Sequence, residues 1–173
     1  MSVTKIEDFY FSSTLNINEF IKPSELSDIY SKNKLRSNEY IDIYLLNKIK
    51  KKIGNKCNNV GYIEEGIHII ERTIGKIHAT HFTGNIHYTI KLDVSICIPL
   101  IGAVVECKVL GKNQVGIMCL AHPLQVMICY NLEDDKTIIE AINPGDLIKV
   151  EILKYRIVLN DKNIKVIGKL LVN

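Results

Sequence analysis

The sequence has few of the residue types with which proteins recognise specific nucleic-acid sequences. It contains no tryptophan, and arginine occurs only at Arg36, Arg72 and Arg156, although lysine is frequent. Arginine supplies the two parallel hydrogen bonds that favour specific recognition of bases and phosphates, so its scarcity disfavours such recognition. The net charge of +3 permits contact with a nucleic-acid backbone but does not indicate it strongly.

The sequence also lacks paired cysteines and long apolar runs. Its five cysteines are odd in number and none forms a Cys-x-x-Cys pair, which disfavours a zinc knuckle and disulfides and indicates a reducing compartment. The uncharged run 94–105 is too short to span a bilayer and is interrupted by Pro99 and Gly102. We therefore expect a soluble protein with no membrane contact and no secretion signal.

Catalytic signatures are missing as well: there is no glycine-rich phosphate loop, nucleophile elbow or dinucleotide fingerprint. His78 and His81 lie close to His87, but strand residues i and i+3 point to opposite faces, and no cysteine or carboxylate completes a ligand set. The acidic stretches 64–65 and 133–135 are typical of solvated loops. The sequence predicts no enzyme activity, metal, cofactor or small-molecule substrate. The rival hypothesis is a small hydrolase with a metal at His78 and His81.

The strongest positive signal is the strict alternation of apolar and polar residues from Ile86 to Ile98. This stretch is about twice as long as a usual strand, and one of its faces is apolar throughout. The strand should therefore lie on a core along its whole length. We expect it to lead from an N-terminal α+β domain, 1–94, into a C-terminal barrel domain, 95–173.

The N-terminal domain is predicted to hold one long helix on an antiparallel sheet. The helix is predicted from Asn38 to Ile53, because apolar residues recur at every fourth position from Ile41 onward and Gly54 supplies a C-terminal stop. The lysines between 48 and 52 complement the helix dipole, and we interpret them as a solvated helix end rather than a nucleic-acid contact. A short helix opening at Pro23 and strands over 8–21, 61–70 and 74–80 complete this domain.

The C-terminal part is predicted to be all-β. Short apolar runs alternate with turn signals such as Asn143-Pro144-Gly145-Asp146. Five strands in about seventy residues, with no spare helix, favour a small five-stranded Greek-key barrel. The predicted strands are 103–110, 114–120, 124–130, 147–155 and 164–172.

A family resemblance covers nearly the whole chain, and the order and spacing of its short motifs carry it. The motifs are Gly61-Tyr62-Ile63, Gly75-Lys76-Ile77, the long strand to Val94, Pro99-Leu100-Ile101-Gly102, Val104 to Val109, Gly116-Ile117 and Asn143-Pro144-Gly145-Asp146. In this order the chain resembles the stalk subunit of cellular RNA polymerases, which is the seventh subunit of eukaryotic RNA polymerase II and has a direct counterpart in the archaeal RNA polymerase. Leu100, Ile101 and Ala103 stand where the family usually carries an aromatic residue and then Gly-Glu. This departure indicates a divergent member, such as one encoded by a large DNA virus or a protist.

The resemblance implies a non-catalytic subunit of a multisubunit DNA-directed RNA polymerase that acts in transcription. Its N-terminal domain would be a tip that docks on the large subunits, and a stalk partner like the family's fourth subunit is a further implied contact. The protein would reside in the nucleus or cytoplasm, and in the virion if a virus encodes it. The implied docking residues are Gly54, Lys56, Asn58, Asn59, Gly61 and Tyr62.

The resemblance implies that the barrel is an OB-fold. It would contact nascent RNA weakly, and such a fold uses cations for phosphates and aromatic rings for stacking. The alternative for these residues is an ordinary solvated surface, with the two tyrosines partly in the core. The alternative for the whole chain is a free-standing OB-fold RNA-binding protein in translation or RNA metabolism. The candidate RNA-binding residues are Lys108, Lys112, Asn113, His122, Tyr130, Lys149, Lys154, Tyr155 and Arg156.

Overall fold

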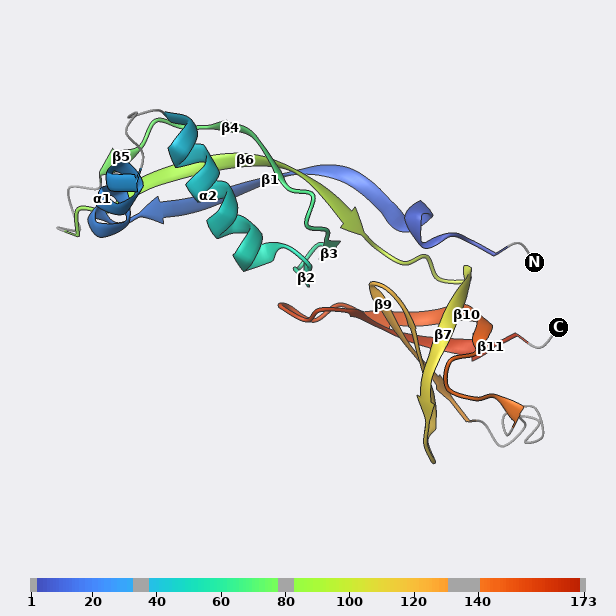
Figure 1. Ribbon diagram of the computed structural model, residues 1–173. Helices are drawn as coiled ribbons and strands as arrows, with labels where there is room; N and C mark the ends of the chain where they lie inside the picture. Colours follow the sequence, from blue (N-terminus) through green and yellow to red (C-terminus); the bar gives the residue numbers. More distant parts are fainter. Residues whose placement is uncertain (1–2, 33–37, 78–82, 131–140, 172–173) are drawn as a thin grey trace. The chain divides into compact units, whose positions relative to one another are not determined.

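The computed structural model describes residues 3–32, 38–77, 83–130 and 141–171, and it divides into two compact units. The barrel unit comprises Met1–Phe11, Asn55–Ile63 and Ile96–Asn173, and the helical unit comprises Ser12–Gly54 and Glu64–Ser95. The two units alternate along the sequence, because each of two long strands has residues in both units (Figure 1). These strands are β1 (Tyr10–Ile21) and β6 (Ile86–Cys97). The domain boundary between residues 94 and 95 stays a prediction.

Strand β6 is the central member of a six-stranded sheet. Its bounds match the predicted strand to within one residue, and Tyr88, Ile90, Leu92 and Val94 on one parity are all buried. The main path of the sheet is β1-β6-β3-β2, and two further strands pair with β6 alone. The other strands of this sheet are β2 (Lys56–Cys57), β3 (Tyr62–Ile63), β4 (His68–Arg72) and β5 (Lys76–Ile77).

The single strand predicted over 61–70 is in fact two strands, β3 and β4. The chain turns between them, where the backbone N–H of Ile67 donates to the carbonyl of Glu65 at 2.7 Å. Both strands still pair antiparallel with β6, so the turn moves the chain along β6 rather than away from it. The part of the predicted strand 74–80 that follows Ile77 lies outside the described residues.

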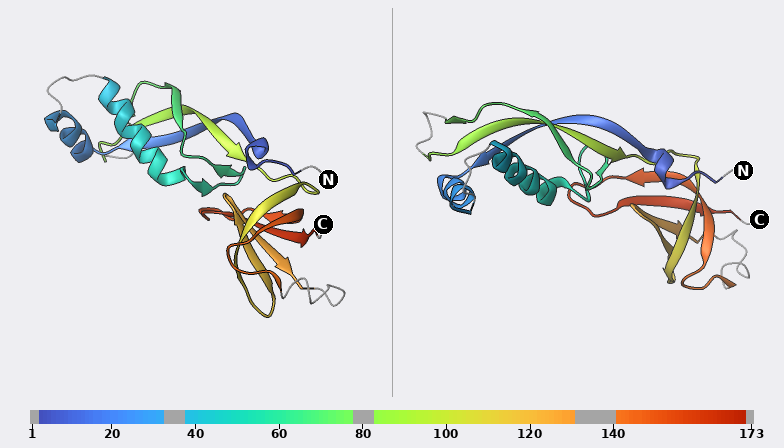
Figure 2. Two further views of the ribbon diagram at one scale, coloured as in Figure 1. Left: turned by 45° about the vertical axis from the view of Figure 1, so that its right-hand side comes forward. Right: turned by 45° about the horizontal axis from the view of Figure 1, so that its top comes forward.

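The described residues hold two α-helices, where the sequence predicted one long helix and a short helix opening at Pro23. Helix α2 (Asn38–Ile53) has the predicted bounds, buries Ile41, Leu45 and Ile49, and lies along one face of the sheet (Figures 1 and 2). Helix α1 (Pro23–Lys32) begins at Pro23, where the short helix was predicted, and has 10 residues. It is supported at its start by Glu25, whose carboxylate accepts from the backbone N–H of Lys22 at 2.9 Å.

The lysines at the end of α2 are not simply a solvated helix end. The ammonium group of Lys48 donates to the carbonyl of Phe20 at 2.7 Å and lies 4.8 Å from the centroid of its ring. Lys52 forms an ion pair with Glu19, whose side chain is only 5% exposed. Because buried carboxylates need a partner, these lysines fasten α2 to β1. A 3-10 turn, η1 (Ile6–Phe9), precedes β1 in the barrel unit.

The predicted five-stranded barrel is confirmed. The strands close in the order β10-β11-β9-β8-β7, and β11 and β9 are parallel while the other neighbours are antiparallel. Alternate residues such as Cys107, Val126 and Ile152 fill the interior. The strands are β7 (Val104–Lys112), β8 (Gly116–Ala121), β9 (Leu124–Cys129), β10 (Leu147–Arg156) and β11 (Ile164–Leu170).

Candidate interaction surfaces

The predicted docking segment forms a tight turn between β2 and β3 in the barrel unit. The side-chain oxygen of Asn58 accepts from the backbone N–H groups of Val60 and Gly61, at 2.8 and 2.9 Å. The N–H of Asn58 also donates to the carbonyl of Gly61 at 2.8 Å. Such a turn uses an asparagine for its local hydrogen bonds rather than for contact with a partner.

The six predicted docking residues differ in how far they are exposed to solvent. Asn59 is exposed, whereas Gly61 and Tyr62 are buried. A Cβ at Gly61 would lie 2.5 Å from a methyl carbon of Ile96, so this position requires glycine. Gly54, Lys56 and Asn58 are partly buried. The docking role stays a prediction, and the tip of the turn is the part of 56–62 that a partner could reach.

Tyr62 and His122 were predicted for different roles, and the structure brings them together within the barrel unit. The Tyr62 hydroxyl and the Nε2 atom of His122 are 3.0 Å apart, and the two rings meet edge to face with centroids 5.5 Å apart. His122 lies between β8 and β9. The pair therefore fastens the β2–β3 hairpin to the barrel. A second link is formed by two backbone bonds, because Cys57 N–H donates to Asp161 and Asn160 N–H donates to Cys57.

We expect Tyr62→Phe to lower the free energy of unfolding by about 1 kcal/mol, the typical net worth of one hydrogen bond. The loss should be no larger because His122 is exposed and water can replace the hydroxyl. Urea unfolding of Tyr62→Phe, His122→Ala and the double variant measures the coupling of the pair. Additive losses in the double variant would show that the bond contributes nothing to stability.

Four of the nine RNA candidates have roles inside the protein. Asn113 accepts from the N–H groups of Val115 and Gly116, at 2.9 and 3.0 Å, and so shapes the turn between β7 and β8. Lys112 donates to the carbonyl of Ile142 at 3.0 Å. Tyr130 packs against the barrel core, and His122 is the partner of Tyr62. These four residues support the fold.

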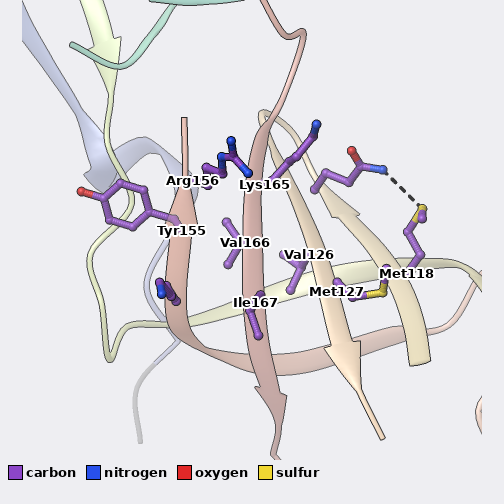
Figure 3. Close-up of a pocket in the computed structure, with 10 residues that line it drawn as sticks. Met118, Val126, Met127, Tyr155, Arg156, Lys165, Val166 and Ile167 are labelled. Atoms are coloured by element: carbon purple, nitrogen blue, oxygen red, sulfur yellow. Dashed lines mark hydrogen bonds between the residues drawn. The ribbon is translucent and has the colours of Figure 1, made fainter. Parts of the chain in front are cut away.

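The remaining candidates lie on the barrel strands. Lys108 is exposed on β7, and Lys149 on β10 is half-buried directly opposite Glu106. Lys154 and Arg156 are exposed near the end of β10, and they flank Tyr155. Only these last three lie together, at a groove of about 510 Å³ on the outer face of the barrel (Figure 3).

One row of side chains crosses four neighbouring strands and forms the floor of this groove. The strand register places Lys154 opposite Ile167, Ile167 opposite Met127, and Met127 opposite Met118. None of these four is buried, whereas the alternate residues Val126 and Val166 are. The row therefore faces outward, and its middle is apolar.

A second row lies two residues further along and supplies the polar rim. Arg156 is opposite Lys165, and Lys165 is opposite Gln125, whose amide donates to the sulfur of Met118 at 3.3 Å. Figure 3 shows Arg156 and Lys165 side by side on their neighbouring strands. Lys165 also forms an ion pair with Asp161 at 2.9 Å. The groove thus combines an apolar floor with a cationic rim.

No aromatic ring lies on the floor of the groove. Tyr155 has the parity of the buried residues Val166 and Val126, and it packs against the barrel core. Its ring points away from the floor in Figure 3. The groove therefore lacks the stacking platform that single-stranded nucleic acids use.

No family model matches this chain. The chain is 29% identical over 140 residues to a protein of Acanthamoeba polyphaga mimivirus that is provisionally named a DNA-directed RNA polymerase subunit. The aligned part covers 74% of this chain and 70% of the mimivirus protein. The similarity thus extends over most of both proteins and is not confined to one short motif.

Sequence reasoning missed most of the groove. Lys165, Gln125, Ile167 and the two methionines Met118 and Met127 were not predicted as site residues. Their alternation on β8, β9 and β11 marks them as outward-facing, and that signal was in the sequence. What was missing was the adjacency of β11 and β9, which are far apart in the chain and pair in parallel.

Among the described residues, no group of three or more histidine, cysteine, aspartate or glutamate side chains could hold a metal ion. His78 and His81, which carried the metal hypothesis, lie outside the described residues. In the same described part, no helix has the length and hydropathy needed to cross a membrane.

Two cysteines inside the barrel are protected by burial. Desolvation raises the pKa of the Cys107 thiol to about 12 and that of Cys119 to about 11. Cys57 and Cys97 are buried too, whereas Cys129 is exposed. Because the thiolate is the reactive form, we expect a disulfide reagent at pH 8 to modify Cys129 rapidly and the other four only after unfolding. Thiol titration with and without denaturant measures this, and Cys129→Ser should abolish the rapid phase.

Proposed function

We propose that this chain is a non-catalytic, stalk-type subunit of a multisubunit DNA-directed RNA polymerase. The observation that carries the proposal is the similarity over 140 residues to a mimivirus protein provisionally named as a subunit of such an enzyme. The closed five-stranded barrel, preceded by a sheet with two helices, supports it because this is the order of elements in the stalk resemblance. We further propose a nuclear or cytoplasmic location, or the virion if a virus encodes the chain.

We propose that the chain docks on the large polymerase subunits through exposed apolar side chains outside the barrel strands. The tip of the β2–β3 turn presents Asn59 and Val60, the latter 46% exposed. In the helical unit, Ile70, Ile74 and Ile77 are 51%, 85% and 66% exposed on and between β4 and β5. Exposed apolar residues on and between two strands that pair with β6 favour a protein–protein interface in this segment. A partner like the family's fourth subunit is a second proposed contact.

We propose that the barrel contacts nascent RNA weakly, through phosphates rather than bases. Lys108, Lys112, Lys154 and Arg156 are the exposed cations among the predicted RNA-binding residues, and Lys112 also donates to the carbonyl of Ile142. A few exposed charges and no stacking platform favour a contact that tolerates any sequence and weakens with salt. Tight, salt-resistant RNA binding by the isolated chain would instead favour a free-standing RNA-binding protein.

A tagged pull-down from the native source at moderate salt, followed by mass spectrometry, tests the polymerase assignment. We expect the two largest polymerase subunits to co-purify in near-equal amounts. The double variant Ile74→Asp/Ile77→Asp should reduce their recovery by about ten-fold or more, since two charges would be placed in the interface. Thr73→Asp is the control: Thr73 is exposed in the same segment, and its side-chain oxygen accepts from the N–H of Thr89 at 3.0 Å, a bond that an aspartate oxygen can also accept. Recovery of only RNA or ribosomal proteins would overturn the assignment.

A further inference from the structure

We propose that the groove on the outer face of the barrel is a docking site for an acidic segment of a partner protein. This segment would insert apolar side chains between the cations of the rim. The groove lies wholly within the barrel unit, and the proposal does not depend on the polymerase assignment.

The floor has the chemistry of a protein-binding surface. Ile167, Met127 and Met118 lie side by side on β11, β9 and β8, and Ile167 is 46% exposed. With neighbouring strands about 4.8 Å apart, the three side chains span about 10 Å, which suits two or three apolar anchors of a peptide. Methionine is unbranched and polarizable, so such a floor adapts to the side chains that it receives.

The rim supplies the charge complementarity. Lys154 and Arg156 are exposed and have no ion pair within the part of the chain that the structure describes. Lys165, beside Arg156, shares its charge with Asp161. Two uncompensated cations next to an apolar floor favour a partner that is acidic between its apolar residues. Arginine and methionine are also enriched at protein interfaces.

The same observations disfavour RNA as the occupant of the floor. A single-stranded nucleic acid gains its affinity from bases stacked on aromatic rings, and the only lining ring, Tyr155, packs against the barrel core. Phosphates would meet Lys154 and Arg156 without contacting the methionines. RNA therefore remains a ligand of the rim, and the floor takes apolar side chains.

Methionine methyl groups allow a direct test on the full chain. The sequence has three methionines, and Met118 and Met127 are the two that line the groove. Protein labelled with carbon-13 at the methionine methyls is titrated with a synthetic peptide rich in glutamate that carries spaced leucines. A peptide with serines in place of the leucines and an oligouridylate are the comparison probes. We expect saturable shifts of the Met118 and Met127 methyls with the leucine peptide alone.

Substitutions at two exposed positions test the rim and the floor of the groove separately. Arg156→Glu should weaken binding of the leucine peptide by about ten-fold, through lost charge complementarity. Ile167→Ser should weaken it similarly, by removing an apolar contact. Lys162→Glu is the control: it makes the same change in charge at an exposed residue outside the groove lining, and it should leave binding unchanged.

Three results would overturn the proposal. Methyl shifts with oligouridylate but not with the leucine peptide would assign the floor to RNA. Shifts that follow the concentration of the protein itself would assign it to a second copy of the chain. The absence of a saturable shift with every probe would show that the groove is not a docking site. None of these results bears on the pull-down, so a failure here is distinct from a failure of the polymerase assignment.

Discussion

Replacing Ile152 by alanine is expected to lower the free energy of unfolding by about 3 kcal/mol or more. Ile152 on β10 is completely buried in the core of the barrel unit. Truncation removes three buried carbons and leaves a cavity that closely packed neighbours fill only in part, and losses of about 2–5 kcal/mol are usual for this change. Small proteins are stable by only about 5–15 kcal/mol, so the urea concentration at the midpoint of unfolding should fall markedly.

The adjacent residue provides the matched control. Leu153 lies next to Ile152 on the same strand but faces the other way, and it is 47% exposed. Leu153→Ala should change the free energy of unfolding by less than about 0.5 kcal/mol. Equal losses at both positions would contradict the burial pattern of β10. A changed slope of free energy against urea would show instead that the variant alters the unfolded state.

The strands could be predicted well because each has a strong local pattern. In β6 the apolar residues occupy one parity, and that parity is the buried one. In the barrel, runs such as Val104–Lys112 are bounded by glycine or polar turns, and each of the five predicted strands overlaps an observed strand. Local periodicity records which face of a strand is covered, and this information needs no knowledge of the partner strand.

The groove could not be predicted because it depends on pairings between distant residues. Ile167 and Met127 are forty positions apart, yet they are register partners in the parallel pair β11–β9. A local pattern shows that each faces outward but not that they are neighbours. Tyr155 was a candidate for stacking on RNA because it is aromatic, with partial burial in the core as the alternative. Its parity places it with the buried residues, which agrees with that alternative.

The roles of charged residues were also predicted wrongly, because the local sequence around a lysine does not show which distant residue it contacts. The lysines of α2 indicated a solvated helix end, but Lys48 and Lys52 reach back to Phe20 and Glu19 on β1. A charged side chain on an exposed face and one that fastens a helix to a strand have the same local sequence. Only the tertiary fold distinguishes them.

Replacing Gly116 by alanine is expected to destabilise the barrel by about 2–3 kcal/mol, although it adds a single carbon. Gly116 opens β8 and pairs with Cys129 on β9. A Cβ at this position would lie 2.1 Å from the carbonyl oxygen of Ile128 and 3.2 Å from the Cα of Cys129. These are backbone atoms of the neighbouring strand, so no side-chain rotation can relieve the clash and the two strands must separate locally.

Gly111 on the paired strand β7 isolates this steric effect from the general effect of adding a methyl group. A Cβ at Gly111 would meet no atom within 4 Å, and its backbone is not in the left-handed region. Gly111→Ala should therefore be neutral or stabilise by a few tenths of a kcal/mol, because alanine restricts the unfolded chain. A loss at both positions would show that the strands need glycine for its flexibility. A loss at Gly116 alone would show that close contact between β8 and β9 is what excludes a side chain there.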